Sequence, residues 1–217
     1  MTANAQTTAD EQNIIKRIPA GYRLHSINGE KQILRGDLNA DGADDYAVII
    51  KEAAASDEAY PARGILIFFK DGDNYKLALE NRKGLGSKDG QICMNCDDRE
   101  ISFEIKKGNL YIIYHTEARF NDIFETFTFR YKNTEFELIG YDNATDNGTW
   151  AESINFATKK KLRKTCSQPN AQPNDCKKTW TTFTMKEPIL LRKIADFPNL
   201  DLNDYMKKTD DKNSNQK

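Results

Sequence analysis

The sequence predicts an all-β protein whose strands form antiparallel meanders. Short segments in which apolar and polar residues alternate recur along the 217 residues, and this period of two is typical of half-buried strands. Turn-forming pairs such as Asn28-Gly29 and Lys107-Gly108 separate the segments. No long stretch shows a helical period, so about ten to twelve short strands explain the pattern.

The first half of the chain alternates between short strands and turns. We expect a disordered tail over residues 1–12, where side chains are small and polar, and a short strand or one helical turn over 13–18. Strands are then predicted over residues 22–27, 32–35, 46–51, 64–69 and 75–79. A loop is expected over 52–63, and the irregular stretch 81–99 is expected to carry function or to be disordered.

The second half predicts a four-stranded antiparallel meander followed by further strands. The meander occupies residues 101–105, 110–115, 127–131 and 136–138, and later strands occupy 149–158, 179–184 and 188–194, the last as an edge strand. The basic run 159–164 reads as a solvated strand end, because acidic segments surround it. We expect one β-rich domain over residues 13–206 and a disordered tail over 207–217.

The most specific motif of the chain is a loop with four oxygen-bearing side chains: Asp37, Asn39, Asp41 and Asp45. This spacing suits Ca²⁺, because alternate residues direct oxygens to one centre, Gly42 permits a sharp turn and Ala43 can add its carbonyl. An EF-hand would have a glutamate at the twelfth position, where Val48 stands inside a predicted strand. The alternative is an Asx-rich turn held by its own hydrogen bonds.

The loop and the strand after it resemble the calcium loop of FG-GAP (integrin-type) repeats, D-x-[DN]-x-D-G-x-x-D, over about residues 33–80. The resemblance implies that Ca²⁺ is bound by four side chains and one carbonyl: Asp37, Asn39, Asp41 and Asp45, with Ala43. A dissociation constant of about 10⁻⁴–10⁻³ M is expected, because no twelfth-position carboxylate contributes. The resemblance also implies partial β-propeller-like sheets. A β-sandwich is the alternative, because only one unit carries the motif.

The later meander resembles a group of uncharacterised bacterial exported proteins and lipoproteins. The matching segments are F-E-I-K-K-G-N-L (103–110), F-T-F-R-Y-K-N (127–133) and F-E-L-I-G-Y-D (136–142), below the upstream D-L-N-x-D-G loop. The resemblance implies an extracytoplasmic location and no settled activity. Near the start, Ala3-x-Ala5 before Gln6 is similar to a signal-peptidase site without its upstream apolar segment, which agrees with export.

Charge and hydropathy argue against two broad classes of protein. Lysine plus arginine (32) balances aspartate plus glutamate (33), giving a formal net charge of −1. This balance argues against a nucleic-acid binder driven by electrostatics. No apolar run approaches the roughly 18 residues of a transmembrane helix, so none is predicted.

The four cysteines favour two disulfides, Cys93–Cys96 and Cys166–Cys176, in an exported protein. Closing a loop of about ten residues stabilises a fold by about 2–3 kcal/mol. A zinc site is less favoured, because the second pair lacks the spacing that the half-site Cys93-x-x-Cys96 would need. A redox pair would need an α/β setting. Free thiols in a cytosolic protein are the remaining alternative.

No catalytic set stands out in the sequence. The two histidines, His25 and His115, lie outside known catalytic motifs. One acidic group could serve a metal or a glycosidase-type pair, although exposed turn chemistry is the favoured explanation: Asp97, Asp98 and Glu100. Three aromatic residues could form a glycan platform, although strand aromatics more often belong to a core: Tyr141, Trp150 and Trp180.

Together these observations predict a calcium-stabilised, non-enzymatic binding module of the bacterial cell envelope, with a protein or a glycan as its ligand. One alternative is an extracytoplasmic hydrolase with an acidic site near Asp97–Glu100. The other is a toxin-neutralising inhibitor protein. The oligomeric state is left open by the sequence.

Overall fold

The computed structural model describes residues 8–27, 29–53, 61–86, 100–117, 121–169, 171–195, 197 and 200–208. The chain divides into two compact units. The first comprises Met1–Gln91, Ile105–Gly108 and Arg192–Asn199; the second comprises Ile92–Glu104, Asn109–Leu191 and Leu200–Lys217. The single β-rich domain over residues 13–206 stays a prediction.

The first unit is built on a five-stranded antiparallel sheet in the order β1-β5-β6-β7, with β4 also paired to β5. Its strands are β1 (Tyr22–Leu24), β4 (Ile33–Gly36), β5 (Asp45–Glu52), β6 (Arg63–Asp71) and β7 (Asn74–Asn81). A small hairpin, β2 (Ser26–Ile27) with β3 (Glu30–Lys31), pairs Ile27 with Glu30, as the Asn28-Gly29 turn signal predicts.

Strand β5 is the centre of this unit. Every residue from Tyr46 to Ile50 is at most 1% exposed, so the strand is buried on both faces and its apolar residues need not alternate with polar ones. One face packs in a cluster with β6, β7 and the N-terminal helix: Ile14, Tyr46, Val48, Ile50, Leu66, Phe68 and Tyr75.

A short helix, α1 (Ala9–Ile15), begins inside the segment expected to be a disordered tail. Its N-terminus forms a capping box: the Thr8 hydroxyl accepts from the Glu11 N–H, and the Glu11 side chain accepts from the Thr8 N–H. Ile14 is fully buried in the cluster around β5. The cap and this one anchor explain why the helix forms. Residues 1–7 lie outside the described part of the chain.

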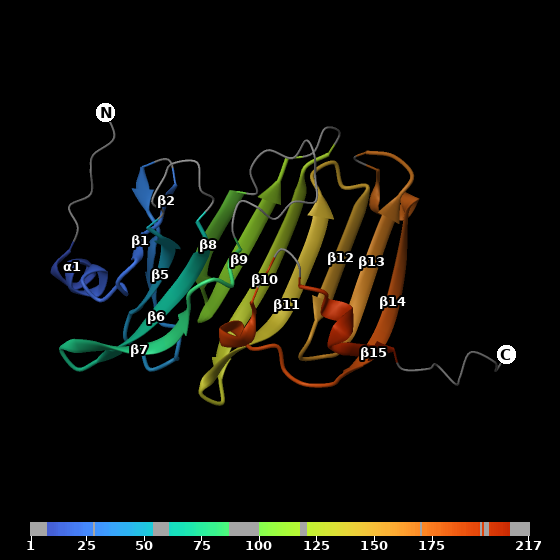
Figure 1. Cartoon of the computed structure of the whole chain (residues 1–217). Coiled ribbons are helices and arrows are strands. Elements are labelled where there is room, and N and C mark those ends of the chain that lie inside the picture. The colour runs from blue at the N-terminus through green and yellow to red at the C-terminus, as the bar shows by residue number, and fades with distance from the viewer. Residues whose placement is uncertain are drawn as a thin grey trace. The chain divides into compact units, whose positions relative to one another are not determined.

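The second sheet has eight antiparallel strands, β8 to β15, each paired with its neighbours in sequence, and it curls into a half-barrel (Figure 1). The strands are β8 (Glu100–Lys106), β9 (Asn109–Thr116), β10 (Ile123–Lys132), β11 (Glu135–Thr145), β12 (Trp150–Asn155), β13 (Lys160–Cys166), β14 (Cys176–Met185) and β15 (Met206–Lys208). The all-β class and the antiparallel meander predicted from the sequence are therefore confirmed.

One face of the larger sheet carries the core of the second unit. Residues paired across neighbouring strands share a face, and on this face a run of apolar side chains is buried: Leu110, Ile112, Phe127, Phe129, Leu138, Ile154, Phe156 and Phe183. The register between β10 and β11 shifts between Thr128 and Phe129. This bulge brings Leu138, rather than Ile139, opposite Phe129.

Two expectations for the C-terminal half are wrong. Residues 188–194 do not form an edge strand: Leu190 makes one isolated bridge to Glu137, and Leu191–Lys193 is a 3₁₀ turn. Three apolar residues of this segment are buried instead, Ile189, Leu191 and Ile194, and β15 takes the edge position. The tail expected over residues 207–217 also starts too early, because β15 extends to Lys208. The basic run 159–164 lies at the start of β13, which begins at Lys160.

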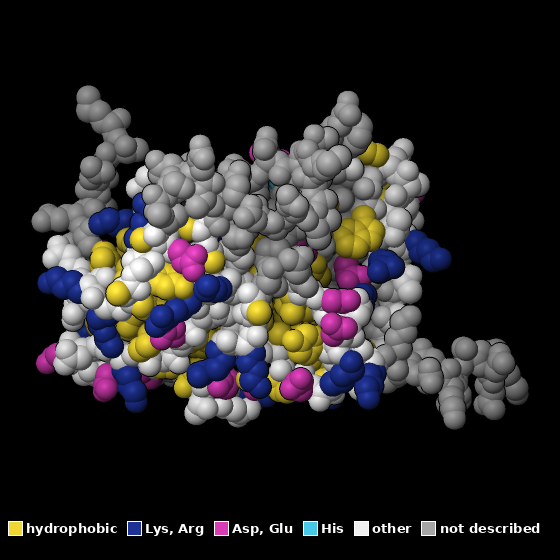
Figure 2. Space-filling view, in the orientation of Figure 1, with side chains coloured by type: hydrophobic (Ala, Val, Ile, Leu, Met, Phe, Trp, Pro, Cys, Tyr) yellow, Lys and Arg dark blue, Asp and Glu magenta, His cyan; other side chains and the backbone are white. Residues whose placement is uncertain are grey.

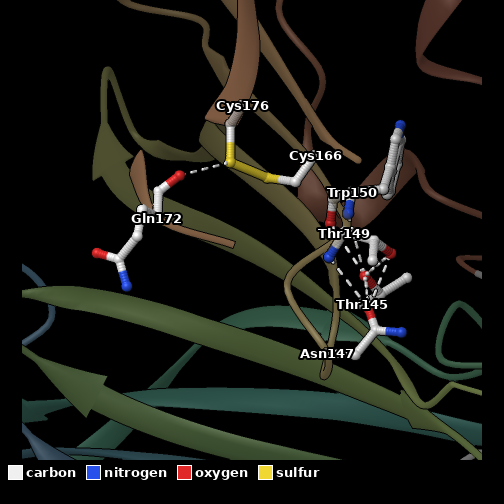
Figure 3. The surroundings of a disulfide bond; sticks show 7 residues. All are labelled: Thr145, Asn147, Thr149, Trp150, Cys166, Gln172 and Cys176. Carbon is white, nitrogen blue, oxygen red and sulfur yellow. Dashed lines mark hydrogen bonds between the residues drawn. A yellow bond between two sulfur atoms is a disulfide. The ribbon is translucent and has the colours of Figure 1, made fainter. Parts of the chain in front are cut away.

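A disulfide joins Cys166 to Cys176, which face each other across β13 and β14 (Figure 3). This pair is confirmed, whereas Cys93 and Cys96 lie outside the described residues. Beside the bridge, the Asn147 side-chain oxygen accepts hydrogen bonds from the Thr149 N–H (3.0 Å) and the Thr145 hydroxyl (3.0 Å). These bonds close the turn between β11 and β12. Among the described residues, no helix is long and apolar enough to span a membrane.

Candidate functional site

The candidate calcium loop connects β4 to β5, whose ends pair Gly36 with Asp45. Two of its residues have left-handed backbone conformations, Ala40 at φ 65° and Gly42 at φ 87°. Glycine adopts this conformation without cost, but alanine does so at about 1–2 kcal/mol. These two residues reverse the chain direction within the loop, and their N–H groups both reach the side chain of Asp37.

The side-chain oxygens of the loop turn inward and accept backbone N–H groups. The two oxygens of Asp37 accept from Ala40 (2.7 Å) and Gly42 (3.0 Å). Asn39 Oδ1 accepts from the Asp41 N–H at 3.0 Å, and Asn39 Nδ2 donates to Asp41 Oδ2 at 2.8 Å. These contacts gather the first three predicted ligands within one turn of the chain.

Asp41 completes this chain of hydrogen bonds, since its Oδ1 accepts from the Ala43 N–H at 2.8 Å. The next residue, Asp44, pairs with Arg35 at 2.8 Å, and both side chains are about half exposed. Asp44 therefore lies on the outside of the loop.

Asp45 anchors the base of the loop from a fully buried position. Its Oδ2 accepts from the Leu38 N–H at 2.8 Å, and its Oδ1 accepts from the Lys70 N–H at 3.0 Å. Burial raises the pKa of Asp45 above its ordinary value, although the two backbone donors oppose the shift. This carboxyl ties the loop to β6 and fixes the loop's position on the sheet.

A turn after β8 packs behind the loop. A Cβ atom added to Gly36 would lie 2.7 Å from Ile105 Cγ2, so only glycine allows this contact. A Cβ at Gly108 would lie 3.6 Å from the Asp37 carbonyl oxygen. The loop is therefore supported by the buried Asp45 at its base and by contacts with Ile105 and Gly108, at the end of β8 and in the turn after it.

The residues of the loop fit a calcium ion in donor type and spacing. A carboxylate oxygen that accepts one N–H keeps a second acceptor direction, so the internal bonds of Asp37 and Asp41 do not use up their capacity. Among the described residues, no group of three or more His, Cys, Asp or Glu is arranged to hold a metal. The predicted ligand set stays a prediction: Asp37, Asn39, Asp41, Ala43 and Asp45.

A second polar array, which the sequence did not reveal, crosses the core-bearing face of the larger sheet. Cross-strand pairing places one residue from each of six neighbouring strands in a single row: Tyr114, Glu125, Asn143, Glu152, Arg163 and Thr179. The available signal was Glu125, a charged residue among the alternating apolar positions of β10. Finding its neighbours requires the register of β11 and β12.

Two residues of this row, Glu125 and Asn143, are joined through Tyr141, which lies on the same face of β11. The Tyr141 hydroxyl donates to Glu125 Oε1 at 2.8 Å and accepts from Asn143 Nδ2 at 2.9 Å. Burial, followed by the nearby Glu125 charge, raises the pKa of Tyr141 well above its ordinary value. Tyr141 therefore stays a neutral donor at physiological pH and is unsuited to act as a base.

A second group of bonds surrounds Glu152, the residue that β12 contributes to the row. Its carboxylate oxygens lie 2.8 Å from Lys161 Nζ and 3.0 Å from Arg163 Nη2, and its side chain is 11% exposed. Two cations on one nearly buried carboxylate balance its charge locally. Two bonded groups therefore lie along the row, one around Glu125 and one around Glu152, and among the described residues the buried Asn143 Oδ1 between them has no hydrogen-bond partner.

The two histidines occupy different environments. Burial, aided by nearby cationic residues, lowers the pKa of His25 to about 4, so its ring is neutral at physiological pH. His115 stacks on Phe124, with ring centroids 4.5 Å apart, and its Nε2 lies 3.1 Å from Asp122 Oδ2. Neither geometry by itself defines a catalytic site.

The remaining predicted sites are scattered. Asp97 and Asp98 lie outside the described residues, so the acidic site of the hydrolase alternative stays a prediction. The three aromatics of the proposed platform do not share one face. Tyr141 and Trp150 lie on the core-bearing face, whereas Trp180 points to the opposite face and is 64% exposed.

Comparisons of the chain with protein-family models, curated proteins and solved structures find no match. The resemblances to FG-GAP repeats and to exported bacterial proteins therefore stay predictions that rest on their motifs.

Proposed function

We propose that this chain is a calcium-stabilised, non-enzymatic binding module that acts outside the cytoplasm in the bacterial cell envelope. The observation that carries the proposal is the loop itself. Asp37, Asn39 and Asp41 are gathered in one tight turn, and the buried Asp45 anchors that turn to the sheet. A cation bound there would fix the connection between β4 and the central strand β5.

The disulfide supports the location. Cys166–Cys176 is a bridge of the kind that persists in oxidising compartments and is rare in the cytosol. Calcium outside the cytosol is abundant enough to fill a site with a dissociation constant of about 10⁻⁴–10⁻³ M. The disulfide and the expected calcium affinity therefore favour the same environment.

Calcium titration with thermal unfolding tests the proposal. With that dissociation constant, about 5 mM calcium stabilises the folded chain by about 1–2 kcal/mol relative to chelator. We expect the Asp41→Ala variant to lose this shift and Asp73→Ala, in the exposed turn between β6 and β7, to retain it. Equal unfolding temperatures in calcium and in chelator would remove the metal from the proposal.

A further inference from the structure

The outer edge of β14 is open along part of its length. β13 pairs with β14 from Cys176 to Thr182, but β15 covers the other side only at Phe183–Met185. No strand within the described ranges pairs with this side over Lys177–Thr181. All five of these residues are exposed. An exposed edge presents backbone N–H and C=O groups that can pair with another strand.

Hollows lie on both faces of this edge. A groove of about 500 Å³ borders Thr179 and Thr181, with Lys161 and Arg163 in its wall. A second hollow of about 420 Å³ borders Trp180 on the opposite face. A strand added to an edge directs alternate side chains to opposite faces, and pockets for those side chains provide specificity. The two hollows match this alternation.

The charge around the edge is positive. On the face of the molecule drawn in Figure 2, basic and acidic side chains are mixed over the described surface. By contrast, residues 160–185 contain one acidic residue, Asp175, and six basic ones: Lys160, Lys161, Arg163, Lys164, Lys177 and Lys178. Glu152 pairs with Lys161 and Arg163. In the described structure, the other four make no ion pair.

Lysines on a sheet edge ordinarily prevent association between copies of the same chain. Two copies paired antiparallel about Lys177 and Lys178 would bring these lysines against each other, and like charges facing each other across strands are destabilising. The same lysines favour a strand that carries carboxylates. The lysines thus oppose that register of self-pairing, and the edge is complementary to an acidic partner.

We propose that the β14 edge at Lys177–Thr181 binds an extended, acidic segment of a partner protein as an added strand. The proposal rests on the proposed function in that it names the ligand class of the binding module. Main-chain hydrogen bonds to β14 hold the segment. Its carboxylates meet Lys177 and Lys178, and an apolar side chain covers the exposed ring of Trp180.

The test uses the full chain and a capped eight-residue peptide of valine and threonine with two adjacent glutamates, so that the added strand presents one carboxylate on each face. Binding is measured by amide chemical shifts and by amide hydrogen exchange. We expect changes centred on Lys177–Thr181 and slower exchange of the amides that point away from β13. A peptide with lysine in place of glutamate should not bind. A peptide of equal charge with proline at alternate positions should bind at least tenfold more weakly, because proline donates no ladder hydrogen bond.

Two variants give a matched comparison on the protein. Lys178→Glu should weaken binding of the acidic peptide about five- to tenfold, because it reverses one facing charge. Lys76→Glu makes the same change on the exposed surface of β7, in the other compact unit, and should leave the affinity within about twofold.

Three results would overturn the proposal. The first is equal affinity for the proline-containing peptide, and the second is equal affinity of Lys178→Glu and the parent chain. The third is displacement of the peptide by an anionic polysaccharide, polygalacturonate, which changes the chemical shifts of Trp180 but does not slow exchange of the β14 amides. Parallel runs in calcium and in chelator separate the two proposals. If calcium does not stabilise the chain but the peptide still binds, only the proposed calcium site is contradicted. If calcium stabilises the chain but the peptide does not bind, only the proposed strand addition to β14 is contradicted.

Discussion

Replacing Asp45 tests how the loop is anchored. In Asp45→Ala, the N–H groups of Leu38 and Lys70 lose the buried carboxylate that accepts them at 2.8 and 3.0 Å. A hydrogen bond to a charged group contributes about 1.5–3 kcal/mol, so two contribute about 3–6 kcal/mol at most. The cost of burying the carboxylate offsets part of this gain. We therefore expect the free energy of unfolding to fall by about 2–4 kcal/mol.

Urea unfolding in chelator measures this loss without any contribution from calcium. The control is Asp44→Ala, which removes a carboxylate from the next residue, where it is about half exposed and paired with Arg35. An exposed ion pair contributes about 0–1 kcal/mol, so this variant should unfold almost as the parent does. If the two variants lose equal stability, the buried hydrogen bonds of Asp45 do not anchor the loop.

The Asp45 carboxyl also predicts a dependence on pH. Burial raises its pKa in the folded state above the ordinary value of 3.8, so the folded chain holds this proton more tightly than the unfolded chain. The stability that the folded chain gains by holding this proton is therefore fully present below pH 3.8. It declines as the pH rises through the folded-state pKa of Asp45. Asp45→Asn has no such proton and should lack this decline. A parallel pH profile for the parent and Asp45→Asn would contradict the assigned shift.

Three further perturbations test other parts of the fold. Replacing Cys166 and Cys176 by serine should lower the free energy of unfolding by about 2–3 kcal/mol, and a reductant should then have no further effect. In Gly64→Ala, the new Cβ would lie 2.3 Å from the Asn81 carbonyl oxygen, so thermal unfolding should shift down by several degrees. The pKa of about 4 predicts that neutral His25 favours the folded state, and that stability falls as the pH drops from 6.5 toward 4. His25→Gln should flatten that part of the pH profile.

The strands were predictable because their signal is local. Alternation in β7 and the meander, and the continuous apolar run of β5, each follow from which faces are buried. The helix was underestimated, although Thr8-Ala9-Asp10-Glu11 is a capping-box pattern. The edge strand expected at 188–194 was wrong because buried apolar residues need not lie in a strand. Ile189 is 1% exposed although it is not in a strand, and its carbonyl accepts one backbone hydrogen bond, from the Leu138 N–H.

The candidate sites likewise differ in whether their residues lie close together in the sequence. The loop oxygens of Asp37, Asn39 and Asp41 lie within five residues, so their spacing alone predicts that they meet. The row containing Glu125 and Glu152 joins residues far apart in the sequence. It depends on the bulge at Thr128 and on the pairing of several strands. The curl of the sheet and the open edge of β14 are likewise properties of the whole sheet, which no local pattern encodes.

Calcium binding to the loop is measured most directly by following backbone amide chemical shifts during a calcium titration of the metal-free chain. We expect saturable shifts centred on Ala40, Gly42 and Ala43, whose N–H groups contact the predicted ligands. All three should report one dissociation constant of about 10⁻⁴–10⁻³ M. Unchanged shifts of these three amides up to about 10 mM calcium, well above that range, would show that the loop is held by its own hydrogen bonds and does not bind the ion.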